Sequence, residues 1–269
     1  MNLAAEKVSG GFKFLEGPVW VPLRNELLFS DIPASKIYRY KNGEFDVFRH
    51  PSGQANGNAL DPQVRLVTCE HENRRVSRTE NDGTIVTLAT HYKGKRLNSP
   101  NDIVCRSDGS VYFSDPPYGV KTEERELDFQ GVFRIEPMVR SPGAPQLLAR
   151  DFAKPNGLAF SPDEELLYIA DTELGNVRVF DVNPDGSIAR SRVFCKVERP
   201  DGIRVDIEGN LYICAMKAVE VFDPAKKKIG EISLVERPAN LAFGDTDRRT
   251  LYICARTGLY RTRVNVPGK

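Results

Sequence analysis

Five side chains that could bind a cation recur along this chain at intervals of about 40 to 55 residues. Two are carboxylates, three are amides, and a sixth position of the same series holds a methyl group. Carboxylate and amide oxygens are the ligands that hard divalent cations prefer, and two carboxylates would balance the charge of one such ion. The positions are Glu16, Asn56, Asn101, Asn156, Asp201 and Ala239.

Calcium is the cation that this set favours, because its irregular coordination at about 2.3–2.6 Å accepts ligands from distant segments. Magnesium and manganese take similar ligands, and zinc with oxygen ligands alone is less usual. A purely structural interpretation stays open, since Asn-Gly and Asp-Gly pairs also form turns. It accounts for Asn56, Asn156 and Asp201, but not for Glu16, which is a poor turn former.

A sequence repeat would have to bring these positions together. Residues from Pro155 read PNGLAFSPDEELLYIAD, residues from Pro200 read PDGIRVDIEGNLYICA, and four further segments fit the same frame. Each copy contains short β-rich runs separated by turn formers, which at about 40–50 residues per repeat is typical of a propeller blade. We therefore expect an all-β, six-bladed β-propeller with four antiparallel strands per blade, formed by residues 1–269 as a single domain.

The last copy is one strand short, because the chain ends soon after GLYRTRV. Residues Ala4 to Val8 precede the first copy and belong to no blade of their own. We expect this N-terminal strand to complete the sixth blade, since closing the ring removes an exposed sheet edge.

Two other positions of the repeat are expected to be structural. The small residues that end the second run of each copy are Ser30, Cys69, Ser114, Ala170, Cys214 and Cys254, so three of the five cysteines share one packing position. The residue directly after this small residue is an acid in several copies, and we expect such acids to accept hydrogen bonds where blades meet. In this second group we expect Asp31, Glu70 and Asp171 to be structural.

Composition excludes several classes of function. Lys plus Arg number 38 against 37 for Asp plus Glu, and these charges are scattered, so no basic stripe for nucleic acid or an anionic membrane is present. No apolar run is long enough to span a membrane, and MNLAAEKVSGG lacks the apolar core of a signal peptide, which predicts a cytoplasmic protein. The sequence lacks GxSxG, HExxH, GxGxxG and GxxxxGK[ST].

Several ordered motifs closely resemble one family over nearly the whole chain. They are LEGPVW, CEHENRRV, RLNSPNDIV, FSDPPYG, KPNGLAFSPD and RPDGIRVD, between Leu15 and Asp206. This set resembles the gluconolactonase/senescence-marker-protein (regucalcin-like) family. The resemblance implies a six-bladed propeller with one divalent metal at the mouth of its channel. Regucalcin-like members have an arginine where this chain has Ser99, and the RLNSPND form is similar to the bacterial gluconolactonase branch.

The resemblance also implies roles for individual residues. Glu16, Asn156 and Asp201 match the metal ligands, and Asn101 matches an asparagine that contacts metal and substrate. Asp201 further resembles the residue that transfers protons. Other polar residues lie in family-like segments near strand ends and are candidates for substrate binding: Arg96, Asn98, His71, Tyr118 and Asp115.

The expected activity is the opening of sugar lactones to aldonic acids, with a small-molecule lactone as the only partner and a monomer or weak homo-oligomer as the assembly. The cation would act as a Lewis acid, and Asp201 would take a proton from water and return one to the ring oxygen. Two alternatives stay open. An organophosphate-hydrolysing propeller would use the same ring and cation, and a non-catalytic calcium-binding propeller would need no such charge-balanced set.

Overall fold

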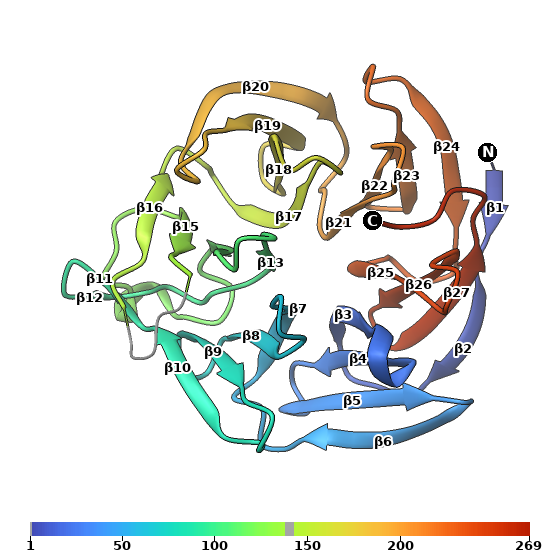
Figure 1. Ribbon diagram of the computed structural model, residues 1–269, viewed down its shortest axis with the longest axis horizontal. Helices are drawn as coiled ribbons and strands as arrows, with labels where there is room; N and C mark the ends of the chain where they lie inside the picture. Colours follow the sequence, from blue (N-terminus) through green and yellow to red (C-terminus); the bar gives the residue numbers. More distant parts are fainter. Residues whose placement is uncertain (1, 138–142) are drawn as a thin grey trace.

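The computed structural model describes residues 2–137 and 143–269, and it confirms the six-bladed, all-β propeller. Six sheets surround a central axis, each built on four antiparallel strands, and in the first four blades these strands follow chain order from the centre outward (Figure 1). The first two blades comprise β3 (Leu15–Val21), β4 (Glu26–Asp31), β5 (Lys36–Lys41) and β6 (Glu44–Arg49), then β7 (Ala55–Leu60), β8 (Leu66–Glu70), β9 (Arg75–Thr79) and β10 (Ile85–Ala89). The next two comprise β13 (Ile103–Cys105), β14 (Val111–Asp115), β15 (Gly131–Ile135) and β16 (Gln146–Ala149), then β17 (Pro155–Phe160), β18 (Leu166–Asp171), β19 (Asn176–Val182) and β20 (Ile188–Lys196).

The N-terminal segment closes the ring, as the sequence predicted, but it also does more. The fifth blade comprises β21 (Ile203–Val205), β22 (Leu211–Cys214), β23 (Ala218–Phe222) and β24 (Lys228–Ser233), and the sixth comprises β25 (Asn240–Gly244), β26 (Thr250–Ala255), β27 (Gly258–Arg263) and β2 (Glu6–Gly10). β2 pairs antiparallel with β27 as the outer strand of blade six. β1 (Asn2–Ala4) instead pairs parallel with β24 and extends blade five, so Ala4 is not part of the closing strand. The N-terminus therefore joins two blades.

The hydrophobic core lies between the blades, because both faces of each inner sheet are covered by neighbours. The second strand of most blades is consequently apolar at nearly every position, as in LLYIAD and LYIC, and is almost completely buried. Cys69, Cys214 and Cys254 are fully buried in these strands, in agreement with their expected packing role.

Glycines allow the inner strands to approach one another closely around the axis. The amide of Gly57 donates to the carbonyl oxygen of Asn101 at 2.8 Å, and a Cβ on Gly57 would lie 2.6 Å from the same oxygen. A Cβ on Gly157 would lie 2.4 Å from the carbonyl oxygen of Asp201. The Asn-Gly pairs at Asn56 and Asn156 thus lie within inner strands and make contacts between blades rather than turns.

The remaining elements are short connections. They are the hairpin β11 (His91–Tyr92) and β12 (Lys95–Arg96) and the 3-10 turns η1 (Pro22–Arg24) and η2 (Thr122–Glu124).

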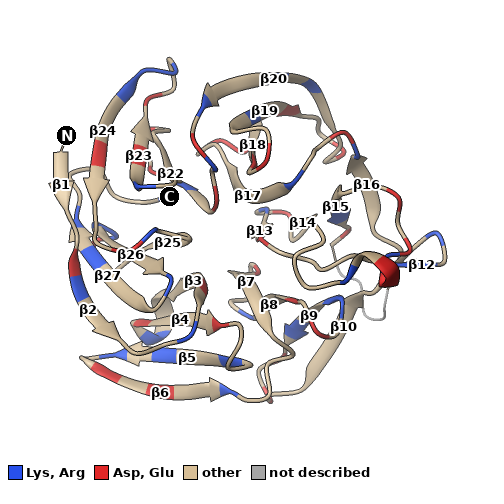
Figure 2. Ribbon diagram, turned by 180° about the vertical axis from the view of Figure 1, so that it is seen from behind, with Lys and Arg blue, Asp and Glu red and all other residues tan. Residues whose placement is uncertain are grey.

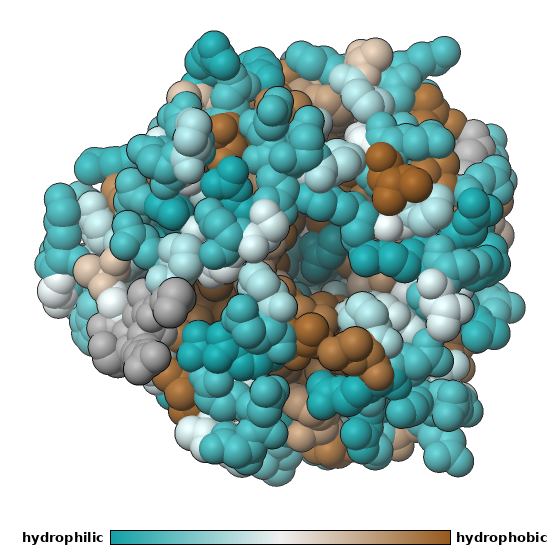
Figure 3. Space-filling view, viewed as in Figure 1, coloured by the Kyte–Doolittle hydropathy of each residue, from teal (hydrophilic) through white to brown (hydrophobic). Residues whose placement is uncertain are grey.

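The two faces of the propeller are the ends of its central channel. Figure 1 is seen from the face that carries η1, where the inner strands end, and Figure 2 shows the opposite face, where the inner strands begin. A hollow lies at the centre of the first face, with hydrophilic residues visible inside it (Figure 3). Within the described ranges, no helix has the length and apolar character needed to cross a membrane.

Candidate functional site

The ring positions identified in the sequence meet at the start of the inner strands, around one end of the central channel. Glu16 lies in β3, Asn56 in β7 and Asn156 in β17, whereas Asn101 and Asp201 lie two residues before β13 and β21. All five line one cavity of about 290 Å³. The other lining residues are Phe14, Ile32, His71, Tyr118, Thr172, Arg199 and Arg237.

Three ring asparagines form a continuous chain of hydrogen bonds. Nδ2 of Asn56 donates to Oδ1 of Asn101 at 2.6 Å, and Nδ2 of Asn101 donates to Oδ1 of Asn156 at 2.8 Å. Nδ2 of Asn156 donates to Thr172 Oγ1 at 3.1 Å, and this hydroxyl donates to the carbonyl oxygen of Pro200 at 2.7 Å. The amides are therefore held in place across blades two to five.

The two ring carboxylates are both held in a low-dielectric environment. Burial raises the pKa of Glu16 well above its usual range, and the negative charges of Asp201 and Asp102 raise it further. Burial also raises the pKa of Asp201, against the lowering effect of Arg237, whose Nη2 lies 3.4 Å from Oδ2 of Asp201. The carboxylates repel one another, so a cation between them would stabilise the ionised forms of both.

A second polar layer lies next to the ring, and the sequence analysis missed it. The residue after each ring position is a glycine in four blades, but it is Asp102 in blade three and Asn240 in blade six. Nδ2 of Asn240 donates to Oε2 of Glu16 at 3.0 Å and to Oδ2 of Asp102 at 3.3 Å. Nη1 of Arg204 lies 3.8 Å from the same Asp102 oxygen. The departure from glycine at these two copies was the signal that could have revealed this layer.

The side chains of the ring fit a hard divalent cation. Oδ1 of Asn56 is buried and has no hydrogen-bond partner in the described part of the chain. The side-chain Oδ1 atoms of Asn101 and Asn156 each accept one hydrogen bond, which leaves each of them a second lone pair. Among residues 2–137 and 143–269, no cluster of three or more His, Cys, Asp and Glu side chains is arranged to hold a metal. The ring set is of a different kind, combining amide oxygens with two buried carboxylates.

His71 and Tyr118, which were proposed to bind substrate, both line the cavity. Nε2 of His71 lies 3.1 Å from Nδ2 of Asn56, and because an amide nitrogen can only donate, Nε2 is the acceptor. Burial lowers the pKa of His71 to about 4, so the ring is neutral near pH 7. Tyr118 is 45% exposed at the edge of the cavity, and its hydroxyl lies 3.5 Å from Nδ2 of Asn156.

The structure places the other three proposed substrate-binding residues away from the lining of this cavity. Arg96 lies in β12, where its amide donates to Glu126 and its guanidinium to the carbonyl oxygen of Asn73. The Asn98 amide donates to Oδ2 of Asp115 at 2.7 Å. Asp115 is fully buried, and burial raises its pKa to about 7. These contacts hold loops of blade three together and, through Arg96, join them to a loop of blade two.

The second group of acids has the structural role expected from the sequence. Asp31 accepts hydrogen bonds from the amides of Lys13 and Phe14, and Asp171 accepts those of Ala153 and Lys154. Each carboxylate thus fixes the segment that leads into the inner strand of its own blade. Glu70 forms ion pairs with Arg49 and Arg75 at 2.6 and 2.7 Å.

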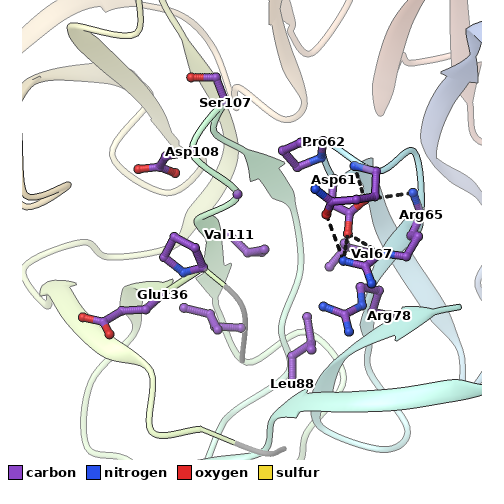
Figure 4. Close-up of a pocket in the computed structure, with 14 residues that line it drawn as sticks. Asp61, Pro62, Arg65, Val67, Arg78, Leu88, Ser107, Asp108, Val111 and Glu136 are labelled. Atoms are coloured by element: carbon purple, nitrogen blue, oxygen red, sulfur yellow. Dashed lines mark hydrogen bonds and ion pairs between the residues drawn. The ribbon is translucent and has the colours of Figure 1, made fainter. Parts of the chain in front are cut away.

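Another cavity, of about 220 Å³, lies between blades two and three (Figure 4). The two arginines that line it are paired with nearby carboxylates. Arg65 lies 2.7 Å from Asp61 and 2.9 Å from Glu80, and Arg78 lies 2.5 Å from Glu80. None of the ring residues lines it. The central cavity is therefore the stronger candidate for the functional site.

Comparisons with known proteins agree with the fold and the motifs. The family model for the SMP-30/gluconolactonase/LRE-like region matches residues 14–257. A gluconolactonase of Zymomonas mobilis is 31% identical, with 98% of this chain and 82% of that protein covered. Regucalcin of Sus scrofa is 27% identical, with 91% and 84% covered. The solved structure of a gluconolactonase from Xanthomonas campestris has a TM-score of 0.88 at 33% identity, covering 98% of this chain and 89% of the other.

Proposed function

Because this chain belongs to the SMP-30/gluconolactonase/LRE-like family, we propose that it is a lactonase that opens sugar lactones to aldonic acids with the help of a bound divalent cation. The observation that carries this proposal is the convergence of Glu16, Asn101, Asn156 and Asp201 on one cavity. Its volume of about 290 Å³ is at the small end of ligand pockets, which suits a single sugar ring.

The cation would be held by Glu16, Asn156 and Asp201, with Asn101 as a further ligand that also contacts substrate. Calcium is our first choice, because the ring offers two carboxylates and neutral amide oxygens, and magnesium, manganese and zinc are alternatives. When bound, such a cation supplies Lewis-acid polarisation of an ester carbonyl and stabilises negative charge on its oxygen. The amide ligands add no negative charge, so they preserve the positive field that this chemistry requires.

Asp201 is the residue that we assign to proton transfer. Its side chain lines the cavity, and burial raises its pKa, which moves the carboxyl group toward the range in which an acid–base group works at neutral pH. Asp201 would accept a proton from the attacking water and return one to the ring oxygen as the ring opens. Arg237 keeps this carboxyl group ionised more readily than burial alone would allow.

His71 and Tyr118 are assigned to substrate positioning rather than to acid–base chemistry. The neutral imidazole accepts a hydrogen bond from Asn56, which orients the first amide of the Asn56–Asn101–Asn156 chain. Burial raises the pKa of Tyr118 to about 12, so its hydroxyl keeps its proton and can donate to a sugar oxygen at the edge of the cavity.

The test is a pH-indicator assay of five- and six-membered sugar lactones with metal-free protein and with calcium, magnesium, manganese or zinc. We expect turnover that depends on one of these cations. Calorimetry should find one strong site, lost when Glu16→Gln is combined with Asn156→Ala, since hard cations depend on both ligand number and charge. Unchanged affinity in that double variant would refute the ligand assignment.

The same assay separates the alternatives. Phosphotriesters should be included, because an organophosphate hydrolase would use the same ring with similar demands on the cation. Hydrolysis of phosphotriesters without lactones would favour that activity. Tight calcium binding without turnover of either class would favour a non-catalytic platform.

A further inference from the structure

Three positively charged residues occupy one position of the repeat, two residues before the ring. This position holds Phe14, Gln54 and Ser99 in the first three blades, but Lys154, Arg199 and Arg237 in the last three. Arg199 and Arg237 line the central cavity, and Nζ of Lys154 lies 5.4 Å from the centre of the Tyr118 ring. Two of the three therefore line the cavity, whereas Lys154 lies outside its lining and pairs with Glu173 at 3.4 Å.

Ser99 does not supply a charge at this position in blade three. Its hydroxyl donates to the carbonyl oxygen of Pro116 at 2.7 Å and accepts from the amide of Gly119 at 2.8 Å. The serine thus fixes the loop that carries Tyr118. The positive charge that lines this cavity comes from Arg199 and Arg237, which lead into blades five and six.

The two arginines have unused hydrogen-bonding capacity. Arg199 is exposed, and no hydrogen bond or ion pair joins its guanidinium to another residue in the ranges described, although its positive charge lowers the pKa of Asp201. Nη2 of Arg237 donates to the backbone carbonyl oxygen of Arg199 at 3.3 Å and lies 3.4 Å from Asp201, while Nε is buried and lacks a partner in the described structure. A cation bound by Asp201 would compete with Arg237 for this carboxylate. Both guanidinium groups are then available to an anion in the cavity.

We propose that the physiological lactone carries a second acidic group, a carboxylate or a phosphate, which Arg199 and Arg237 bind. This inference rests on the proposed lactonase activity and narrows its substrate class. Water adds to the lactone carbonyl carbon, the ring C–O bond breaks, and the ring oxygen gains the proton that the water loses. The second acidic group takes no part in these steps and is the same in substrate and product. Guanidinium groups suit both anions because they offer paired donors to carboxylate or phosphate oxygens.

The kinetic test compares three lactones at saturating metal: gluconolactone, the monolactone of glucaric acid, and phosphogluconolactone. We expect kcat/KM for at least one charged lactone to exceed that for the neutral one by roughly 10-fold or more, the range of a charge-assisted hydrogen bond. The difference should shrink as salt is added, because screening weakens interactions between partly exposed charges. The better of the two charged lactones identifies the acidic group.

Arg199→Gln is the most informative variant, since Arg237 also touches Asp201. We expect it to lower the ratio of charged to neutral kcat/KM roughly 10-fold, and Arg199→Lys to restore part of this ratio. Arg190→Gln is the matched control, because that side chain is 81% exposed on the outer strand of blade four. An unchanged ratio in Arg199→Gln would overturn the inference and leave lactonase activity intact.

Calorimetry provides a readout that does not depend on turnover. Glucarate and phosphogluconate, the open-chain products, should bind more tightly than gluconate to metal-loaded and metal-free protein, and Arg199→Gln should remove that advantage. If no lactone is hydrolysed, the proposed function fails, and these titrations still decide whether the arginines form an anion site. Equal binding of all three products would argue against it.

Discussion

Nδ2 of Asn240 donates a hydrogen bond to Oε2 of Glu16 at 3.0 Å, joining the first and last inner strands across the closure of the propeller. The backbone amide of Gly17 donates a second hydrogen bond to the same Oε2 atom at 2.8 Å. One carboxylate oxygen is thus fixed from two sides. The proposed cation ligand is oriented by a residue that does not itself line the cavity.

We therefore expect Asn240→Ala to weaken divalent-metal binding by about 10-fold or more without unfolding the protein, as is usual when a residue that orients a ligand is lost. Calorimetry with calcium would measure the change. Circular dichroism should be unaltered. An affinity equal to that of the unmodified protein would mean that Glu16 is oriented by the Gly17 amide alone.

Asp201→Asn should separate metal binding from proton transfer. An amide oxygen can still contact a cation, but it cannot accept a proton at neutral pH. We expect measurable metal binding and a fall in turnover of about 10²–10⁴ at saturating metal. If turnover stays within a few-fold of the unmodified enzyme, Asp201 is only a ligand, and the proton is handled by another group.

Deleting residues 1–9 should cause unfolding or aggregation although no ring residue is removed. The deletion takes away β1 and nearly all of β2, and it exposes the edges of β24 and β27 in two blades. Thermal unfolding and gel filtration would measure the effect. Lys7→Ala is the control, because it removes only a partly exposed ion pair with Glu236 and should cost far less. Full stability of the truncated protein would contradict the role of the closing strand.

Glu236 should make the closure sensitive to acid. It accepts hydrogen bonds from Lys7, Thr257 and Tyr260, and these contacts lower its pKa from about 4.5 to about 2 despite the opposing effect of burial. Because the folded-state pKa is lowered, the stabilisation is complete above about pH 4.5 and is lost as the pH falls toward 2.

The corresponding measurement is the melting temperature between pH 7 and pH 3. Glu236→Gln should lie a few degrees below the unmodified protein at pH 7, and the two curves should converge in acid. Glu44→Gln, at an exposed acid in β6, serves as the control. A difference that persists unchanged at pH 3 would show that the charge of Glu236 is not the cause.

The sequence by itself determined the blades and the ring. Each blade is a local unit of four short strands with its own turns, so the repeat gives the strand order without knowledge of distant contacts. A propeller then brings equivalent positions together around its axis, which is why Glu16 and Asp201 could be placed in one site from spacing alone. The closing strand followed from the strand count of the last copy, although β1 and its parallel pairing with β24 did not.

Only the tertiary structure decided which neighbouring side chains share the site. Asn98 and Asp115 lie in motifs that resemble the family's, yet they point into loop contacts of blade three, because side-chain direction depends on the backbone path after each strand. Asp102 and Asn240 lie one residue beyond the ring and meet because glycines in the other blades leave room for them. Contacts of this kind join residues 138 positions apart, and no local pattern encodes them.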